Sequence, residues 1–156
     1  MVNGYILNNQ LTDFALSPTK NGKPLANRVE AGKRPRSSMS PVMVFNKDGS
    51  LRLVVGSPGG SRIIDYVAQV VVGVLDWNLD AQTAINLPRI TNRNNYTSLE
   101  KGTELANAES EFVNRGHTVR ILDLNSGLHA VEVKDGKLYG AADPRREGIA
   151  LSDKSH

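Results

Sequence analysis

The sequence predicts an α+β fold in which an antiparallel sheet carries helices. Residues 46–50 and 134–137 each contain Asp-Gly between two apolar runs, a pattern typical of β-hairpins. Apolar residues at helical spacing lie between these hairpins, and strands and helices do not alternate regularly. We therefore expect an antiparallel sheet with helices packed on one face rather than a doubly wound parallel sheet.

The first 36 residues are predicted to contain little regular structure. Residues 5–8 are a short apolar strand candidate. Residues 15–36 contain Pro, Gly, Lys and Asn, few apolar side chains and no aromatic residue. Loops of this length are uncommon in compact domains and are usually functional or disordered. We therefore expect residues 15–36 to form a long lid-like loop.

Regular elements are predicted from residue 41 onward. The strand at residues 51–55 runs into a glycine-rich turn, and apolar residues then recur at helical spacing, with Ser61 as the expected N-cap. Pro88 and Gly116 are stop signals for two shorter helices. The other expected elements are strands at residues 41–45, 118–122, 128–133 and 138–141 and helices at residues 80–87 and 104–115.

Composition limits the class of protein. A chain of 156 residues that is 39% hydrophobic and 22% charged matches one globular domain over residues 1–156. Its 19 basic and 16 acidic residues give a net charge of +3, the basic residues are spread along the chain, and 5% of residues are aromatic. These features argue against a nucleic-acid partner. No apolar run approaches the roughly 20 residues of a membrane span.

Cysteine and histidine usage narrows the possible chemistry further. The chain has no cysteine, so disulfides and thiolate catalysis are excluded. Its three histidines, His117, His129 and His156, lack the spacing of metal ligands. Neither a metal site nor a cofactor is expected.

The glycine-rich turn at residues 56–61, Gly-Ser-Pro-Gly-Gly-Ser, is the sharpest local feature. Such a turn between a strand and a helix leaves backbone N–H groups facing open space, where they bind negative charge. It lacks the lysine of a Walker phosphate loop, so the functional interpretation is an oxyanion hole. The alternative is a tight turn in which glycine only supplies positive φ.

Two polar pairs precede this turn in the sequence. Ser37 and Ser38 place adjacent hydroxyls ahead of a strand, where they could hold a carboxylate or form a serine-rich turn. Gln10 and Asp13 place an amide and a carboxylate three residues apart, which suits an ammonium group or a capping role. The residues by themselves leave both alternatives open for each pair.

Four sequence blocks resemble signature blocks of the gamma-glutamyltranspeptidases. They are LNNQLTDF at residues 7–14, RPRSSMSP at 34–41, GSPGGSRII at 56–64 and LYGAADPR at 138–145. Their order and spacing also fit that family. The resemblance therefore spans nearly the whole chain.

The resemblance implies a fold and a reaction. The family has the N-terminal-nucleophile hydrolase fold, an αββα sandwich of two antiparallel sheets with helices on both outer faces, which this chain would form incompletely. One precursor cleaves itself into a large and a small subunit, and the new N-terminal threonine attacks gamma-glutamyl amides such as glutathione. The glutamyl-enzyme intermediate is then resolved by water or an amine. The implied partner is the large subunit, and the implied location is periplasmic or extracellular.

The resemblance also assigns roles to three pairs of residues. The first pair holds the α-ammonium of the glutamyl group, the second holds its α-carboxylate, and the third stabilises the tetrahedral oxyanion with backbone N–H groups. In that order, the pairs are Gln10 and Asp13, Ser37 and Ser38, and Gly59 and Gly60.

Two departures from the family pattern qualify these assignments. The family's threonine block would lie before Val2 and is absent from the sequence, so we expect this chain alone to be inactive. The lid-like loop has no aromatic residue to act as a gate, which favours a more open site.

Two other interpretations stay open at the level of sequence. One is a noncatalytic or degenerate domain that only binds glutamyl groups. The other is a related acylase of different specificity, such as a cephalosporin acylase or a poly-gamma-glutamate depolymerase. Joint retention of the four glutamyl-binding residues favours an unmodified glutamyl head group.

Overall fold

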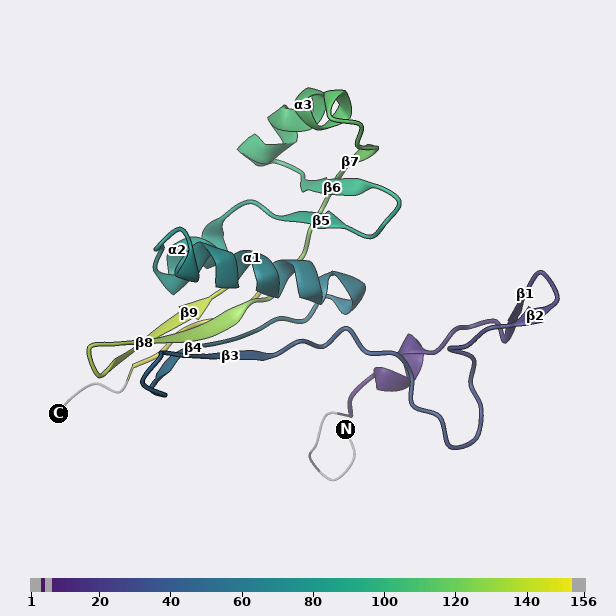
Figure 1. The fold of residues 1–156 in the computed structure, drawn as a ribbon, viewed down its shortest axis with the longest axis horizontal. Coiled ribbons are helices and arrows are strands. Elements are labelled where there is room, and N and C mark those ends of the chain that lie inside the picture. The colour runs from purple at the N-terminus through teal and green to yellow at the C-terminus, as the bar shows by residue number, and fades with distance from the viewer. Residues whose placement is uncertain (1–3, 5–6, 153–156) are drawn as a thin grey trace. The chain divides into compact units, whose positions relative to one another are not determined.

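The computed structural model describes residue 4 and residues 7–152 (Figure 1). The chain divides into two compact units, Met1–Ser38 and Met39–His156. The strand candidate at residues 5–8 falls partly outside the described residues. The assignment of residues 1–156 to one domain stays a prediction.

The first unit begins with a 3-10 helix, η1 (Gln10–Asp13). Phe14 follows it directly and is buried, with 7% of its surface exposed. Gln10 and Asp13 therefore lie on one helical turn, directly before a buried aromatic side chain.

The predicted lid-like loop, residues 15–36, contains an antiparallel hairpin. Its turn is formed by Asn21 and Gly22, whose φ angles of 52° and 73° are the positive values that two-residue hairpin turns require. A parallel bridge joins Ala15 to Arg28. The paired strands are β1 (Thr19–Lys20) and β2 (Lys23–Pro24). A function of this loop as a lid stays a prediction.

The second unit contains a four-stranded antiparallel sheet in the order β3-β4-β8-β9. Both hairpins predicted from Asp-Gly are confirmed, as the pairs β3-β4 and β8-β9. The strands are β3 (Val42–Phe45), β4 (Leu51–Gly56), β8 (His129–Lys134) and β9 (Lys137–Ala142).

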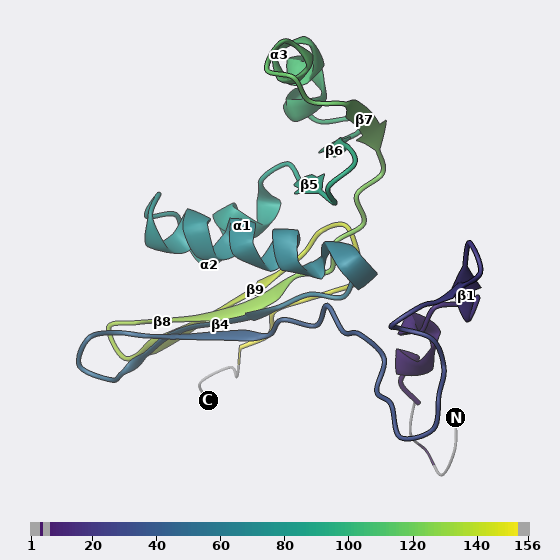
Figure 2. The same cartoon turned by 45° about the vertical axis from the view of Figure 1, so that its right-hand side comes forward.

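Helices α1 (Ile63–Leu75) and α2 (Ala81–Asn86) lie on the same side of this sheet in both views (Figure 1, Figure 2). Val67, Val70 and Val74 of α1 are buried at helical spacing and belong to the same core as Leu53 and Val55 of β4. The predicted α+β class, with helices on one face of an antiparallel sheet, is confirmed. None of the described helices is long and apolar enough to cross a membrane.

The start of α1 differs from the prediction, because Ser61 is not its N-cap. Ser61 lies inside a 3-10 helix, η2 (Gly60–Arg62), and Arg62 occupies the N-cap position without a side-chain hydrogen bond. The turn winds directly into η2, where the Arg62 N–H donates to the Gly59 carbonyl oxygen at 3.3 Å. The chain is thus already helical at the position where a serine cap would act.

Two strands of a second, three-stranded sheet escape prediction. They carry Thr91, Thr97 and Ser98, which are at most 2% exposed, so polar residues replace the apolar alternation that indicates a strand. The third strand pairs with its neighbour in parallel. The predicted helix at residues 104–115 is a 3-10 segment followed by a short α-helix. The elements are β5 (Ile90–Asn92), β6 (Thr97–Glu100), η3 (Glu104–Ala108), α3 (Glu109–Asn114) and β7 (Val119–Leu122).

The face of the four-stranded sheet opposite the helices is partly uncovered. Met43 and Phe45, which alternate with inward-facing valines on β3, are 61% and 56% exposed. Ala150 packs closely on Gly140 of β9, because a Cβ at Gly140 would lie 2.9 Å from the Ala150 Cβ. Of the predicted αββα sandwich, this unit therefore contains one antiparallel sheet with helices on one of its faces.

Candidate functional site

The glycine turn leaves β4 and enters η2 with an unusual backbone. Gly59 has φ 139° and Gly60 has φ 59°, a range that favours glycine. Crowding adds a second constraint at Gly59, where a Cβ would lie 2.8 Å from Cε2 of the Tyr66 ring, whereas a Cβ at Gly60 would have no neighbour within 4 Å. Within the described part of the chain, neither N–H donates a hydrogen bond. Two adjacent donors are therefore available to an external acceptor.

The loop before β8 contacts the glycine turn through Gly127. Ser57 Oγ accepts from the Gly127 N–H at 3.3 Å and donates to the Pro58 carbonyl oxygen at 2.7 Å. A Cβ at Gly127 would lie 2.7 Å from Cγ of Pro58. A larger residue at this position would therefore collide with the Pro58 ring.

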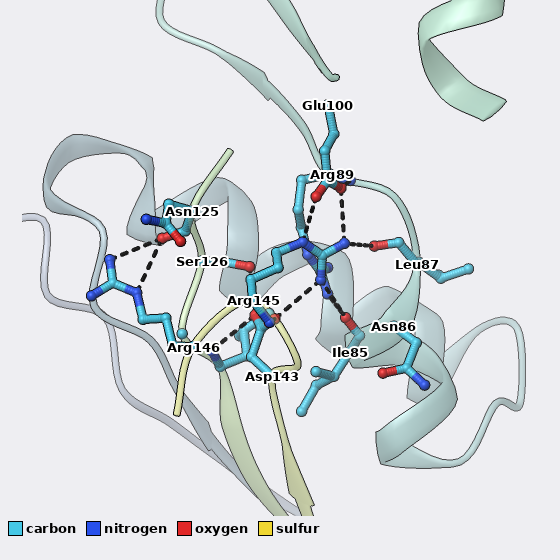
Figure 3. A network of polar contacts seen from close by, with 12 residues as sticks. Ile85, Asn86, Leu87, Arg89, Glu100, Asn125, Ser126, Asp143, Arg145 and Arg146 are labelled. Atoms are coloured by element: carbon cyan, nitrogen blue, oxygen red, sulfur yellow. Dashed lines mark hydrogen bonds and ion pairs between the residues drawn. The ribbon is translucent and has the colours of Figure 1, made fainter. Parts of the chain in front are cut away.

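A buried carboxylate holds this loop in place (Figure 3). Asp143, fully buried at the end of β9, accepts from Ser126 Oγ at 2.5 Å and from the Leu128 N–H at 3.1 Å. It also forms an ion pair with the Arg145 guanidinium at 3.1 Å. The conformation of the loop that backs the glycine turn thus depends on Asp143.

Arg145 connects this carboxylate to the second sheet and to α2. Its guanidinium donates to both carboxylate oxygens of Glu100, at 2.5 and 2.8 Å. It also donates to the carbonyl oxygens of Ile85 at 3.2 Å and Leu87 at 3.0 Å, which end α2. Residues distant in sequence therefore meet at a single guanidinium (Figure 3).

A second buried arginine completes the network. Arg89 is fully buried. Its backbone N–H donates to the Glu100 carboxylate at 2.7 Å, and its guanidinium donates to the Ile85 carbonyl oxygen. Burial, and then repulsion from Arg145, lowers the pKa of Arg89 to about 10. Burial opposes ionisation of Asp143, but hydrogen bonds led by that from Ser126 outweigh it and hold its pKa below the usual range. Arg89 and Asp143 are therefore both charged at neutral pH.

Residues 143–146 do more than the sequence indicates. In isolation, Asp-Pro-Arg-Arg reads as a polar turn that ends a strand. In the structure, its aspartate and first arginine organise the network around Glu100. The sequence did contain a signal for these residues, because residues 138–145 resemble a signature block of a known family. That resemblance assigned no role to Asp143 or Arg145.

In the first unit, the predicted ammonium-binding pair is pre-oriented. Gln10 Nε2 donates to Asp13 Oδ2 at 3.1 Å. This bond leaves Gln10 Oε1 and Asp13 Oδ1 as acceptors, and both residues are half-buried. The arrangement suits a cationic group with several N–H donors.

Asn27, which sequence reasoning missed, links this pair to the serine segment. Its Nδ2 donates to the Asp13 carbonyl oxygen at 2.7 Å, and its Oδ1 accepts from the Arg36 N–H at 2.9 Å. Arg36 directly precedes Ser37, which is exposed, and Ser38, which is half-buried. The first unit thus holds together the segments that carry the two predicted pairs.

The two halves of the predicted site lie in different units. The glutamyl-binding pairs belong to Met1–Ser38, and the glycine turn belongs to Met39–His156. We predict that the Gly59 and Gly60 N–H groups face a cavity shared with Asp13, Ser37 and Ser38. Among the described residues, no group of three His, Asp or Glu side chains could hold a metal ion.

Several known proteins are similar to this chain over most of its length. The family model for gamma-glutamyltranspeptidase matches residues 1–152. A glutathione hydrolase proenzyme of Escherichia coli is 40% identical over 153 residues, which are 91% of this chain and 26% of that protein. An acylase proenzyme of a Pseudomonas species is 33% identical over 151 residues, 96% of this chain and 26% of that protein.

Solved structures agree with the sequence matches. A mutant gamma-glutamyltranspeptidase of Helicobacter pylori has a TM-score of 0.78 and 35% identity, covering 93% of this chain and 83% of that one. This likeness confirms the predicted N-terminal-nucleophile hydrolase fold. The chain spans about a quarter of the length of the curated relatives it matches.

Proposed function

Since the chain belongs to the gamma-glutamyltranspeptidase family, we propose that it forms most of the small subunit of a gamma-glutamyltransferase and glutathione hydrolase. Its partner is the large subunit of the same precursor, and its substrates are glutathione and other gamma-glutamyl amides. We also propose a periplasmic or extracellular location, which follows from the family resemblance alone.

The main support for this proposal is the glycine turn. Gly59 and Gly60 offer two adjacent N–H donors on a backbone that the Tyr66 ring and positive φ angles restrain. A rigid pair of donors stabilises the negative charge that develops on a carbonyl oxygen during acyl transfer. A turn that only reverses the chain does not need such crowding at Gly59.

In the proposed reaction, the nucleophile is a threonine of the same precursor outside this chain. Its α-amine takes the hydroxyl proton while the oxygen attacks the gamma-carbonyl carbon. The Gly59 and Gly60 N–H groups hold the resulting oxyanion. Collapse of this intermediate expels the amine with the transferred proton and leaves a glutamyl ester. Water or an acceptor amine then attacks the ester carbonyl, which breaks the ester bond, releases glutamate or a new gamma-glutamyl amide and regenerates the threonine.

Donor recognition is assigned to the first unit. Gln10 Oε1 and Asp13 Oδ1 accept hydrogen bonds from the α-ammonium, and the Ser37 and Ser38 hydroxyls bind the α-carboxylate. The acylase relative suggests a second candidate function. We take it as an acylase for donors without an α-ammonium. The Gln10–Asp13 hydrogen bond favours the glutamyl donor, because it orients acceptors that such an acylase would not use.

The decisive experiment compares two preparations with two chromogenic donors. The donors are a gamma-glutamyl anilide and a glutaryl anilide, which lacks only the α-ammonium. We expect the processed two-subunit enzyme to cleave the glutamyl donor preferentially, and this chain alone to cleave neither. Preference for the glutaryl donor would support the acylase instead. Turnover by the chain alone that Ser38→Ala abolishes would make a serine the nucleophile.

Asp13→Ala in the complete enzyme should weaken use of the glutamyl donor. Charge-assisted hydrogen bonds contribute about 1.5–3 kcal/mol, so we expect kcat/KM to fall about 10- to 150-fold. The glutaryl donor should be little affected, since it has no ammonium. Thr12→Ala, which removes an exposed hydroxyl from the same helical turn, is the matched control. An equal loss with both donors would contradict the assigned role of Asp13.

A further inference from the structure

We propose that Asn27 is a positioning residue for donor binding, which fixes the spacing between the ammonium-binding pair and the serine pair. The inference rests on the proposed function of both pairs. It assigns a role to a residue in the predicted lid-like loop that does not itself touch the donor.

Asn27 forms hydrogen bonds to three separate residues of the first unit. Its side-chain N–H donates to the Asp13 carbonyl oxygen at 2.7 Å, its side-chain oxygen accepts from the Arg36 N–H at 2.9 Å, and its own carbonyl oxygen accepts from the Ala15 N–H at 2.9 Å. The contacts reach 14 residues back and 9 residues forward. Asn27 therefore links the segments that precede and follow it, at Asp13 and Arg36, within one long loop.

The chemistry of the donor explains why these hydrogen bonds of Asn27 matter. The α-ammonium and the α-carboxylate of a glutamyl group are bonded to the same carbon, so their separation is fixed by covalent geometry. Two protein segments can bind both groups only if the spacing of the segments matches. Binding groups must be held within about 0.5 Å of the productive geometry, and a flexible loop between Asp13 and Arg36 would not provide this.

An asparagine is well suited to this position. A carboxamide donates and accepts at once, whereas aspartate cannot donate and alanine does neither. The ion pairs of Glu30 with Arg28 at 3.0 Å and with Lys33 at 2.6 Å join residues no more than three positions apart, and such ion pairs near the surface contribute little. The half-buried Asn27 carboxamide joins Asp13 to Arg36 across the loop.

The test is a double-mutant cycle in the complete processed enzyme. We expect Asn27→Ala to raise KM for the gamma-glutamyl anilide at least tenfold with little change in kcat, and to leave KM for the glutaryl anilide nearly unchanged. In an Asp13→Ala background, Asn27→Ala should have almost no further effect on KM, because the spacing no longer matters once the ammonium partner is removed. Asn21→Gly, in the hairpin turn of the same loop, is the control and should change neither constant.

The outcomes separate two kinds of failure. No turnover of either donor by the wild-type enzyme would overturn the proposed function and this inference with it. Normal wild-type turnover, with equal losses for both donors or full additivity with Asp13→Ala, would overturn the inference alone and leave Asn27 with a purely structural role. Faster amide exchange at Arg36 in Asn27→Ala is expected, since that N–H loses its acceptor, and unchanged exchange would also overturn the inference.

Discussion

Gly59→Ala should lower kcat of the complete enzyme about 100- to 1,000-fold, the loss that follows from displacing one oxyanion donor. The φ of 139° at Gly59 is one that a residue with a Cβ does not adopt without strain. The added Cβ would also lie 2.8 Å from the Tyr66 ring. The turn must therefore move, and the adjacent N–H groups move with it.

Gly60→Ala is the matched comparison. Its φ of 59° lies in the left-handed region that non-glycine residues visit at a cost of about 1–2 kcal/mol, and its Cβ would enter open space. We expect this variant to keep kcat within about 30-fold of wild type even if the whole cost raises the barrier, because about 1.36 kcal/mol corresponds to a factor of ten. Activity is measured per processed enzyme with the gamma-glutamyl anilide. Equal kcat in Gly59→Ala and wild type would refute an oxyanion role for the turn.

Arg145→Ala should destabilise the second unit by about 3–5 kcal/mol, because removing one partner of a buried ion pair leaves the other charges without compensation. Glu100 and Asp143 would both lose a guanidinium partner. Two carbonyl oxygens at the end of α2 would lose a donor as well. The loop that backs the glycine turn should open more often as a result.

Arg146→Ala provides the control for this prediction. Arg146 is the adjacent arginine and donates to the Asn125 carbonyl oxygen from an exposed position (Figure 3), so its removal should cost no more than about 1 kcal/mol. Thermal unfolding of the complete enzyme gives the overall effect. Amide exchange at Leu128, whose N–H donates to Asp143, reports the local one. Equal stability of the two variants would mean that the network contributes little.

Local signals were sufficient for much of the fold. Asp-Gly between apolar runs identified the hairpins β3-β4 and β8-β9, and apolar spacing identified α1. The helix boundary at Asp80 was also correct, since its carboxylate caps α2 through the Thr83 N–H at 2.9 Å. Strands β5 and β6 were missed because polar side chains, among them Thr91, Thr97 and Ser98, are buried in them, so the apolar alternation that indicates a strand is lacking.

The candidate site divides in the same way. The sequence by itself determined the family resemblance and the glycine turn, and it predicted the three residue pairs, because turn chemistry and short motifs are encoded by neighbouring residues. Only the tertiary structure revealed the hydrogen bond from Asn27 to Asp13, the crowding of Gly59 by Tyr66 and the ion pair between Arg145 and Glu100. These features join residues 7 to 45 positions apart. Contacts at such separations leave no periodic or adjacent pattern in the chain, so the packed structure alone decided them.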